Sequence, residues 1–160
     1  MKTRQIVSSL ALAAALSLGL AGCGMFVPTA TLEQYAPSDG IDVTIETVAV
    51  RNLMLVSDAE GKEFNVVFTG VNNGDSPALL RLTFVNASGS AEATADFNLE
   101  PGLNVFGPKG GETKPTYIEL NGPMPGDTVT AFVEVAGLES VERDVPVLDG
   151  VLKEYEDLVP

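Results

Sequence analysis

Apolar and polar residues alternate along most of this chain, which gives each segment one apolar and one polar face. The segments with this period of two lie at residues 41–45, 64–68, 80–84, 91–99, 128–135 and 141–147, with shorter apolar pieces at 105–106 and 117–120. Alternation of this kind is typical of strands that are buried on one side. Glycine, asparagine, aspartate and proline separate the segments, so we predict about eight short strands joined by turns.

Two interruptions of the pattern carry information. After Ile45, the parity of the apolar positions slips through Val48–Val50 and Leu53–Leu55, which predicts a β-bulge or a bend. Further along, Asn73-Gly74 follows an apolar segment. Asn-Gly predicts a hairpin turn, because both central residues of a type I′ turn need a positive φ.

The absence of a long helical pattern makes the chain all-β, and we predict one antiparallel β-sandwich over residues 41–150. The last residues, 151–160, form a C-terminal tail. Leu152, Tyr155 and Leu158 stand at helical spacing there. That spacing is compatible with one or two turns packed on the sandwich, or with a frayed end.

The N-terminus has the features of a lipoprotein signal peptide over residues 1–22. Lys2 and Arg4 precede an apolar run that ends in Leu20-Ala21-Gly22-Cys23. A charged start, a short apolar run and small residues before a cleavage site are typical of secretory signals. The placement of Cys23 resembles the bacterial lipobox, which implies a diacylglycerol on the Cys23 thiol and, in some lipoproteins, an acyl chain such as palmitate on the new amino terminus. Residues 23–40 then form a flexible tether.

The amino-acid composition excludes several classes of function. The chain has 22 acidic and 9 basic residues, no His, no Trp and one Cys, so catalysis through histidine and an intramolecular disulfide are excluded. Removal of residues 1–22 leaves 7 basic residues and a net charge of −15. This charge disfavours nucleic acid as a partner and keeps the domain off an anionic membrane surface.

Acidic residues are frequent, but they match no metal motif. The segment Asp58–Glu63 lacks the spacing of a calcium loop, and a solvated hairpin turn explains it better. Asp39, Asp42 and Asp127 would bind a hard cation only if the fold brought them together. A carboxylate pair for glycoside hydrolysis is disfavoured, because sugar-binding clefts rely on aromatic residues and the chain has no Trp.

Two further groups of residues are candidates for a ligand or metal site. The segment Gly107–Pro115 is rich in glycine and proline but does not match a phosphate-binding loop, so we expect an inter-strand loop. Thioethers select Cu(I), and the chain beyond residue 22 has Met25, Met54 and Met124. Isolated methionines of this kind are more often packing residues than ligands.

The later segments carry short motifs in a particular order. These are Val71-Asn72-Asn73-Gly74-Asp75, a Gly-rich loop, Tyr117-Ile118-Glu119-Leu120-Asn121-Gly122, Gly126-Asp127-Thr128-Val129, Ala136-Gly137 and Val145-Pro146-Val147. In this order they resemble the PCuAC-type periplasmic copper chaperone family, in particular its actinobacterial lipoprotein branch. Tyr35–Gly40 and Val50-Arg51-Asn52 add to the resemblance, which covers roughly residues 43–147.

The resemblance implies a cupredoxin-like or immunoglobulin-like sandwich. It also implies copper ligands of the His and Met type, with a late His-x-Met at the positions that hold Tyr117 and Glu119 here. Because the chain has no His, this ligand set cannot be carried over to any of its residues. A shared fold does not by itself transfer a function.

These observations lead to two functional hypotheses. The first is a non-enzymatic lipoprotein without a cofactor, anchored through Cys23 on the extracytoplasmic face of the cell membrane, whose sandwich presents an interaction surface. Its partner would be another envelope protein or the cell-wall matrix. The alternative is a metal-handling lipoprotein related to copper chaperones that uses Met and carboxylate ligands in place of His.

Overall fold

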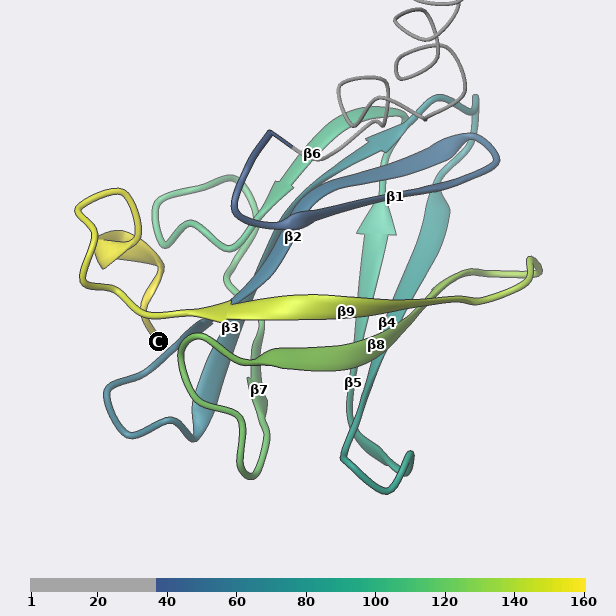
Figure 1. Ribbon diagram of the computed structural model, residues 1–160. Helices are drawn as coiled ribbons and strands as arrows, with labels where there is room; N and C mark the ends of the chain where they lie inside the picture. Colours follow the sequence, from purple (N-terminus) through teal and green to yellow (C-terminus); the bar gives the residue numbers. More distant parts are fainter. Residues whose placement is uncertain (1–36) are drawn as a thin grey trace, which may run out of the picture. The chain divides into compact units, whose positions relative to one another are not determined.

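The computed structural model describes residues 37–160, and these form an all-β domain (Figure 1). Its strands are β1 (Ile41–Ile45), β2 (Val48–Ser57), β3 (Glu63–Asn72), β4 (Ala78–Val85), β5 (Ala91–Leu99), β6 (Gly102–Phe106), β7 (Tyr117–Glu119), β8 (Thr128–Val135) and β9 (Val141–Leu148). The all-β prediction is therefore confirmed. Within residues 37–160 there is no helix long and apolar enough to cross a membrane.

The strands form two layers that share one strand. One layer has the order β5-β4-β8-β9, and the other contains β2, β3 and β6, with β1 beside β2 and β7 beside β3. Most of β9 pairs antiparallel with β8, but its last residues, Val147 and Leu148, pair in parallel with β2. The predicted antiparallel sandwich thus needs one correction, because this short parallel pairing makes the sheet mixed and joins the two layers at one side.

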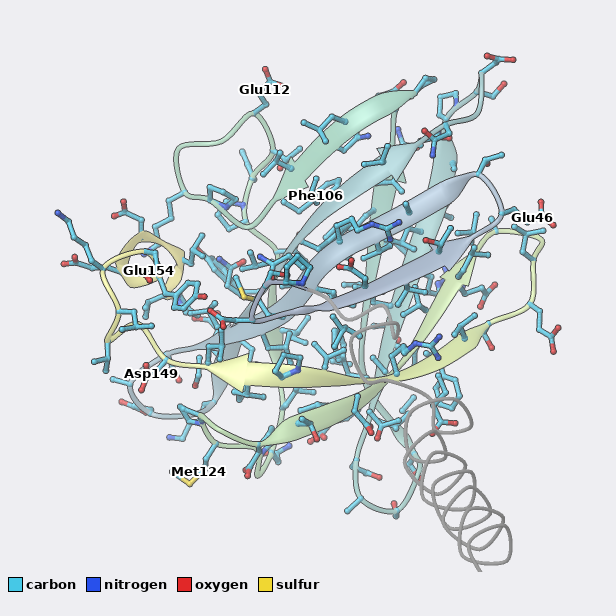
Figure 2. The ribbon with its side chains drawn as sticks, turned by 45° about the horizontal axis from the view of Figure 1, so that its top comes forward. Glu46, Phe106, Glu112, Met124, Asp149 and Glu154 are labelled. Atoms are coloured by element: carbon cyan, nitrogen blue, oxygen red, sulfur yellow. The ribbon has the colours of Figure 1, made fainter. Side chains whose placement is uncertain are left out.

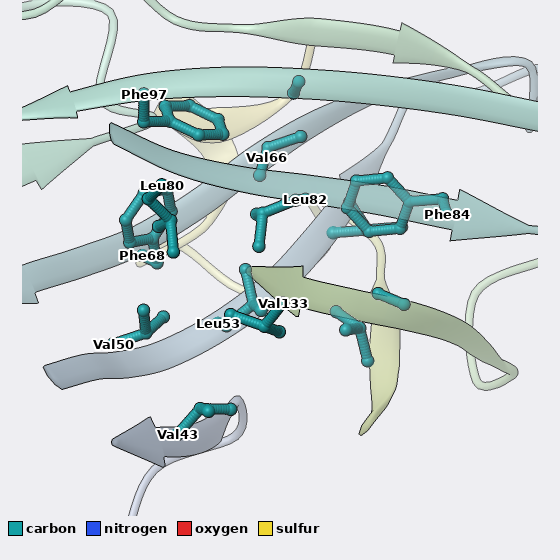
Figure 3. Packing of buried hydrophobic residues seen from close by; sticks show 14 of the residues in the cluster. Val43, Val50, Leu53, Val66, Phe68, Leu80, Leu82, Phe84, Phe97 and Val133 are labelled. Atoms are coloured by element: carbon teal, nitrogen blue, oxygen red, sulfur yellow. The ribbon is translucent and has the colours of Figure 1, made fainter. Parts of the chain in front are cut away.

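The core lies between the layers and is built by the alternating positions (Figure 3). Leu80, Leu82 and Phe84 of β4 face Val50 and neighbouring residues of the other layer, and all of them are buried. Burial of such side chains contributes about 1.5–3 kcal/mol each, and this is the main stabilisation available to a domain without a disulfide.

Three aromatic rings close the side of the sandwich opposite the β2–β9 pairing. Phe97 of β5 meets Phe68 of β3 edge-on, with ring centroids 4.8 Å apart, and Phe106 of β6 stacks on Phe68 at 4.7 Å. Edge-on and stacked rings gain about 0.5–1.5 kcal/mol beyond their buried area. The free edges of β5 and β6 are therefore held together by side chains where no ladder joins them.

The predicted slip of parity in β2 is a bulge at Asn52. Both the β1–β2 and the β2–β3 registers shift there, and Asn52 has a positive φ of 53°. The Asn52 side chain accepts a hydrogen bond from the Gly40 N–H at 2.8 Å, and its backbone N–H donates to Asp42 at 3.0 Å. These bonds hold the bulge and place the first described residues beside it.

The hairpin predicted at Asn73-Gly74 is wrong. β3 and β4 do not pair, so this turn is a corner at which the chain crosses from one layer to the other. Asn72, which is buried, holds the corner: its amide donates to Ser76 and Leu99 carbonyls, and its Oδ1 accepts from the Gly74 N–H. The Asn73 N–H bonds to the Thr47 carbonyl. The long-range bonds to Leu99 and Thr47 replace the ladder that a hairpin would have formed.

The C-terminal residues pack on the outer face of β2 and β3. A 3-10 turn at Glu156–Leu158 places Leu158 against Met54, Val56 and Val67, with Tyr155 beside them. The interpretation of residues 151–160 as one or two packed turns fits this arrangement. Leu152, however, is 52% exposed and does not share the buried face.

Candidate functional site

Several predicted residues do not form a site. Cys23, Met25, the signal peptide and most of the tether lie outside the described residues. Asp39 accepts a hydrogen bond from Tyr155, Asp42 binds Asn52, and Asp127 accepts one from the Met124 N–H. Among residues 37–160, no group of three or more His, Cys, Asp or Glu side chains is arranged to hold a metal ion. The carboxylates of residues 39, 42 and 127 are therefore not brought together.

The two described methionines have different roles. Met54 is buried in the small cluster under the C-terminal turn and fills space between side chains. Met124 is 64% exposed at the tip of the loop between β7 and β8, where Figure 2 shows its side chain directed away from the domain. The two thioethers lie in separate environments and form no common ligand set.

The segment Asp58–Glu63 is a hairpin turn, as predicted. It joins β2 to β3, with the Asp58 N–H bonded to the Glu63 carbonyl at 2.9 Å. The Lys62 backbone N–H donates to the Asp58 carboxylate, and this bond lowers the pKa of Asp58. The loop at Gly107–Pro115 also lies where the sequence placed it, between β6 and β7.

The two positions at which the resemblance implies a His-x-Met lie on β7. Ile118 between them is buried, so Tyr117 and Glu119 face outward. In the pairing of β7 with β3, Glu119 stands directly opposite Glu63. Like charges in this cross-strand position destabilise a sheet, so the pair suits a site that receives positive charge.

An open cleft of about 470 Å³ lies next to β7, at the end of the domain that faces down in Figure 1. It is bordered by the β4–β5 loop and by the loop between β7 and β8. A smaller hollow of about 340 Å³, which contains Glu63 and Glu119, adjoins it. Asn121 lines both spaces and therefore stands at their junction.

Glu92 is an acidic residue of the cleft whose carboxylate accepts two hydrogen bonds. Its Oε1 accepts hydrogen bonds from the Asn121 backbone N–H at 2.8 Å and from the Asn121 side-chain amide at 2.7 Å. The Glu92 residue is half-buried, and its Oε2 has no hydrogen-bond partner among the described residues. Asn121 thus fixes the carboxylate in one orientation at the wall of the cleft.

The charge of this region is strongly negative. We define the acidic end as the two adjoining hollows with the carboxylates Glu63, Glu92, Glu119 and Asp127. Lys62 is the one basic residue that lines them, and its ammonium group already pairs with Glu60 at 3.1 Å. An arrangement of fixed and exposed carboxylates attracts cations and accepts hydrogen bonds from their donors.

No protein-family model matches the sequence, and no curated protein matches it. Solved structures similar to the chain include two PCuAC domains. One is described as the apo PmoF2 PCuAC domain, at 14% identity and a TM-score of 0.49, covering 69% of this chain and 97% of that one. The other is the copper-bound PCuAC domain from PmoF2, at 13% identity and a TM-score of 0.40, covering 68% and 97%.

Both solved structures are PCuAC domains. PCuAC is also the family that the sequence motifs resemble.

Sequence reasoning missed the contact between Glu92 and Asn121. Glu92 stands on the polar side of an alternating strand, where a solvated glutamate is expected, and Asn121 lies 29 residues further along. No local pattern connects the two positions. The only available signal was the motif from Tyr117 to Gly122, which contains Asn121 but does not identify its partner.

Proposed function

We propose that this chain is a non-catalytic lipoprotein of the cell envelope whose acidic end binds a positively charged ligand, with a basic segment of another envelope protein as its partner. The observation that carries the proposal is the Glu92 carboxylate, which two N–H groups of Asn121 hold at the wall of an open cleft. A carboxylate held in this way loses little conformational freedom when a ligand binds, which favours affinity.

Charge supports the same proposal. The four carboxylates of the acidic end act together with the net charge of −13 of the whole chain. Such a field attracts basic groups from a distance, raises their association rate and repels acidic ones. Selectivity then comes from the hydrogen-bonding residues that line the cleft beside Glu92, such as Thr128.

Lipid attachment at Cys23 belongs to this proposal. A diacylglycerol supplies two chains, and each buried CH₂ contributes about 0.8 kcal/mol, so the two together are enough for stable anchoring. The anchor would hold the domain at the extracytoplasmic face of the membrane. The acidic end would then meet partners within a thin layer next to the bilayer, where the number of accessible proteins is limited.

Photo-crosslinking in intact cells tests the proposal. A photoreactive residue at Met124, at the rim of the acidic end, should capture one predominant protein, whereas the same residue at the distant, exposed Leu103 should not. The second change Glu92→Gln should reduce the yield at Met124 by about tenfold, because it removes a fixed charge. The matched control Glu142→Gln alters an exposed carboxylate of β9 and should have no effect. Equal capture from Met124 and Leu103 would contradict the proposal.

A second candidate function is metal handling related to that of copper chaperones. The observation that favours it is the pair Glu63 and Glu119, whose like charges stand opposite each other and would be neutralised by a bound cation. Isothermal titration with Cu(I), Cu(II) and Ca²⁺ decides between the candidates. Binding at micromolar metal that disappears in Glu119→Gln supports metal handling, and an absence of heat with all three ions rejects it.

A further inference from the structure

A buried amide lies on the side of β3 that faces away from the core. Asn65 is fully buried, and its Nδ2 donates to the Gly107 carbonyl and to the Leu158 carbonyl, both at 2.8 Å. Two carbonyl acceptors fix the NH₂ end of the amide in this direction, because an oxygen there would face two oxygens. The other end, Oδ1, is buried and has no partner among the described residues.

An unpaired buried acceptor needs an explanation, because it lowers the stability of the fold. Asn65 lies under residues 149–160, which we call the C-terminal strap. The strap offers the amide a carbonyl, that of Leu158, but no N–H. While the strap covers Asn65, the NH₂ end of its amide is therefore bonded and the Oδ1 end is not.

The strap covers an apolar groove. Met54, Val56 and Val67 form the floor, and Leu158 lies on them with Val159 and Tyr155 alongside. These floor residues belong to β2 and β3, and their side chains stand on the outer face of the layer. Without the strap, they would form an exposed apolar strip with the Asn65 amide beside it.

Few bonds hold the strap in place. Its bonds between two backbone groups are internal, such as those from Tyr155 N–H to the Leu152 carbonyl and from Leu158 N–H to the Tyr155 carbonyl. Within residues 37–160, its hydrogen bonds to the rest of the domain are those of Leu158 with Asn65 and of Tyr155 with Asp39. No ladder joins the strap to a strand, so it can separate from the groove without unpairing a sheet.

Charge also weakens the association of the strap with the rest of the domain. It contains four acidic residues and one basic residue, a formal charge of −3, while residues 1–148 carry the remaining −10 of the total −13. Asp149 and Glu154 project from its outer side (Figure 2). Two negatively charged parts are thus held together by apolar contact, and a segment with positive flanks would suit the same groove better.

We propose that the groove under the strap is a docking site for an extended apolar segment with basic flanks from a partner protein, and that the strap is its built-in competitor. In an extended segment, the N–H and C=O of one residue point to the same side. Such a residue would give Asn65 Oδ1 the N–H that it lacks and replace the Leu158 carbonyl at Nδ2. This site is separate from the acidic end and does not depend on the function proposed for it.

Peptide binding to the full chain tests the proposal. The probe is a fluorescein-labelled peptide with the sequence of residues 149–160 in which each Asp and Glu is replaced by lysine. It should bind the wild-type chain and bind Leu158→Ala about tenfold more tightly, because a loosened strap leaves the groove open in a larger fraction of molecules. The control Leu152→Ala changes an exposed leucine of the same strap and should leave the Kd unchanged.

The side-chain amide of Asn65 shows whether the peptide binds in the groove under the strap. Its ¹H–¹⁵N resonances in the wild-type chain should shift in proportion to the bound fraction. A labelled peptide with the unmodified sequence of residues 149–160 should bind about tenfold more weakly than the lysine peptide. Three results would overturn the proposal: no change in anisotropy up to about 1 mM with folded Leu158→Ala, the same Kd for the two leucine variants, or binding that leaves the Asn65 amide unmoved.

Discussion

Gly107 offers a quantitative test of how tightly the loop after β6 is packed. It has a φ of +112°, and a Cβ atom added there would stand 2.8 Å from Val67 Cγ2 and 3.1 Å from Val67 Cα. Gly102, at the start of β6, has a similar φ of +97°, but an added Cβ would meet no atom within 4 Å. The two glycines therefore share the backbone strain and differ in the steric contact.

The expected magnitudes follow from this difference. An alanine at a φ in this region costs about 1–3 kcal/mol at either position, reduced by about 0.4–1 kcal/mol because alanine lowers the entropy of the unfolded chain. Overpacking against Val67 adds about 1–3 kcal/mol at position 107 alone. We expect Gly107→Ala to lower the free energy of unfolding by about 1–3 kcal/mol more than Gly102→Ala does.

Urea unfolding at 25 °C measures both values. Far-ultraviolet circular dichroism follows the strands, which is convenient because the chain has no Trp. The slope m should stay constant, so that a shift in the midpoint reports stability. If the free energies of unfolding of the two variants differ by less than about 0.5 kcal/mol, the loop can shift to accommodate the added methyl group. The close approach of residue 107 to β3 then does not constrain the fold.

Three further predictions address the strap, the core and the anchor. The hydrogen bond with Asp39 raises the pKa of Tyr155 to about 12, above its ordinary value of 10.0, so the stability it contributes is complete below pH 10 and is lost as the pH rises toward 12. Tyr155→Phe should flatten this part of the stability profile, and an unchanged slope in denaturant titrations from pH 9 to 12 would contradict the assignment. Leu82→Ala should cost about 2–5 kcal/mol in urea unfolding because Leu82 is fully buried, whereas the exposed Leu103→Ala should stay within about 0.5 kcal/mol. Cys23→Ala should move the protein from the membrane to the soluble fraction, and a variant that still requires detergent would refute lipid attachment at that residue.

The strands were predictable because their signal is local. Residues such as Val129, Ala131 and Val133 repeat every second position, and a strand buried on one side needs nothing more. The bulge at Asn52 was predictable for a similar reason, since a slip in parity marks the point at which one residue must be absorbed. Local pattern and local structure agree in both cases.

Pairing partners and covered faces were not predictable in this way. Asn73-Gly74 reads as a hairpin turn, but its bonds to Thr47 direct the chain across to the other layer. Asn65 reads as a solvent-facing residue between two apolar ones, yet Leu158, 93 residues further along, covers it. The acidic end also depends on such distant contacts, because Glu92 of β5 obtains its partner from the loop that follows β7, two strands later. These features arise from tertiary structure, which a single strand's pattern does not contain.

The shared position of β9 has a consequence for the order in which the chain acquires its structure. Strands of the two layers are interleaved along the sequence, and the parallel pairs Leu55–Val147 and Val56–Leu148 unite the layers through β9, which follows all the other strands of the sandwich. Pairings between residues so far apart form slowly, because the intervening chain must first be ordered. The polypeptide is thus unable to complete its sandwich until β9 has left the ribosome. A late closure of this kind lengthens the time during which the earlier strands exist without their full set of partners.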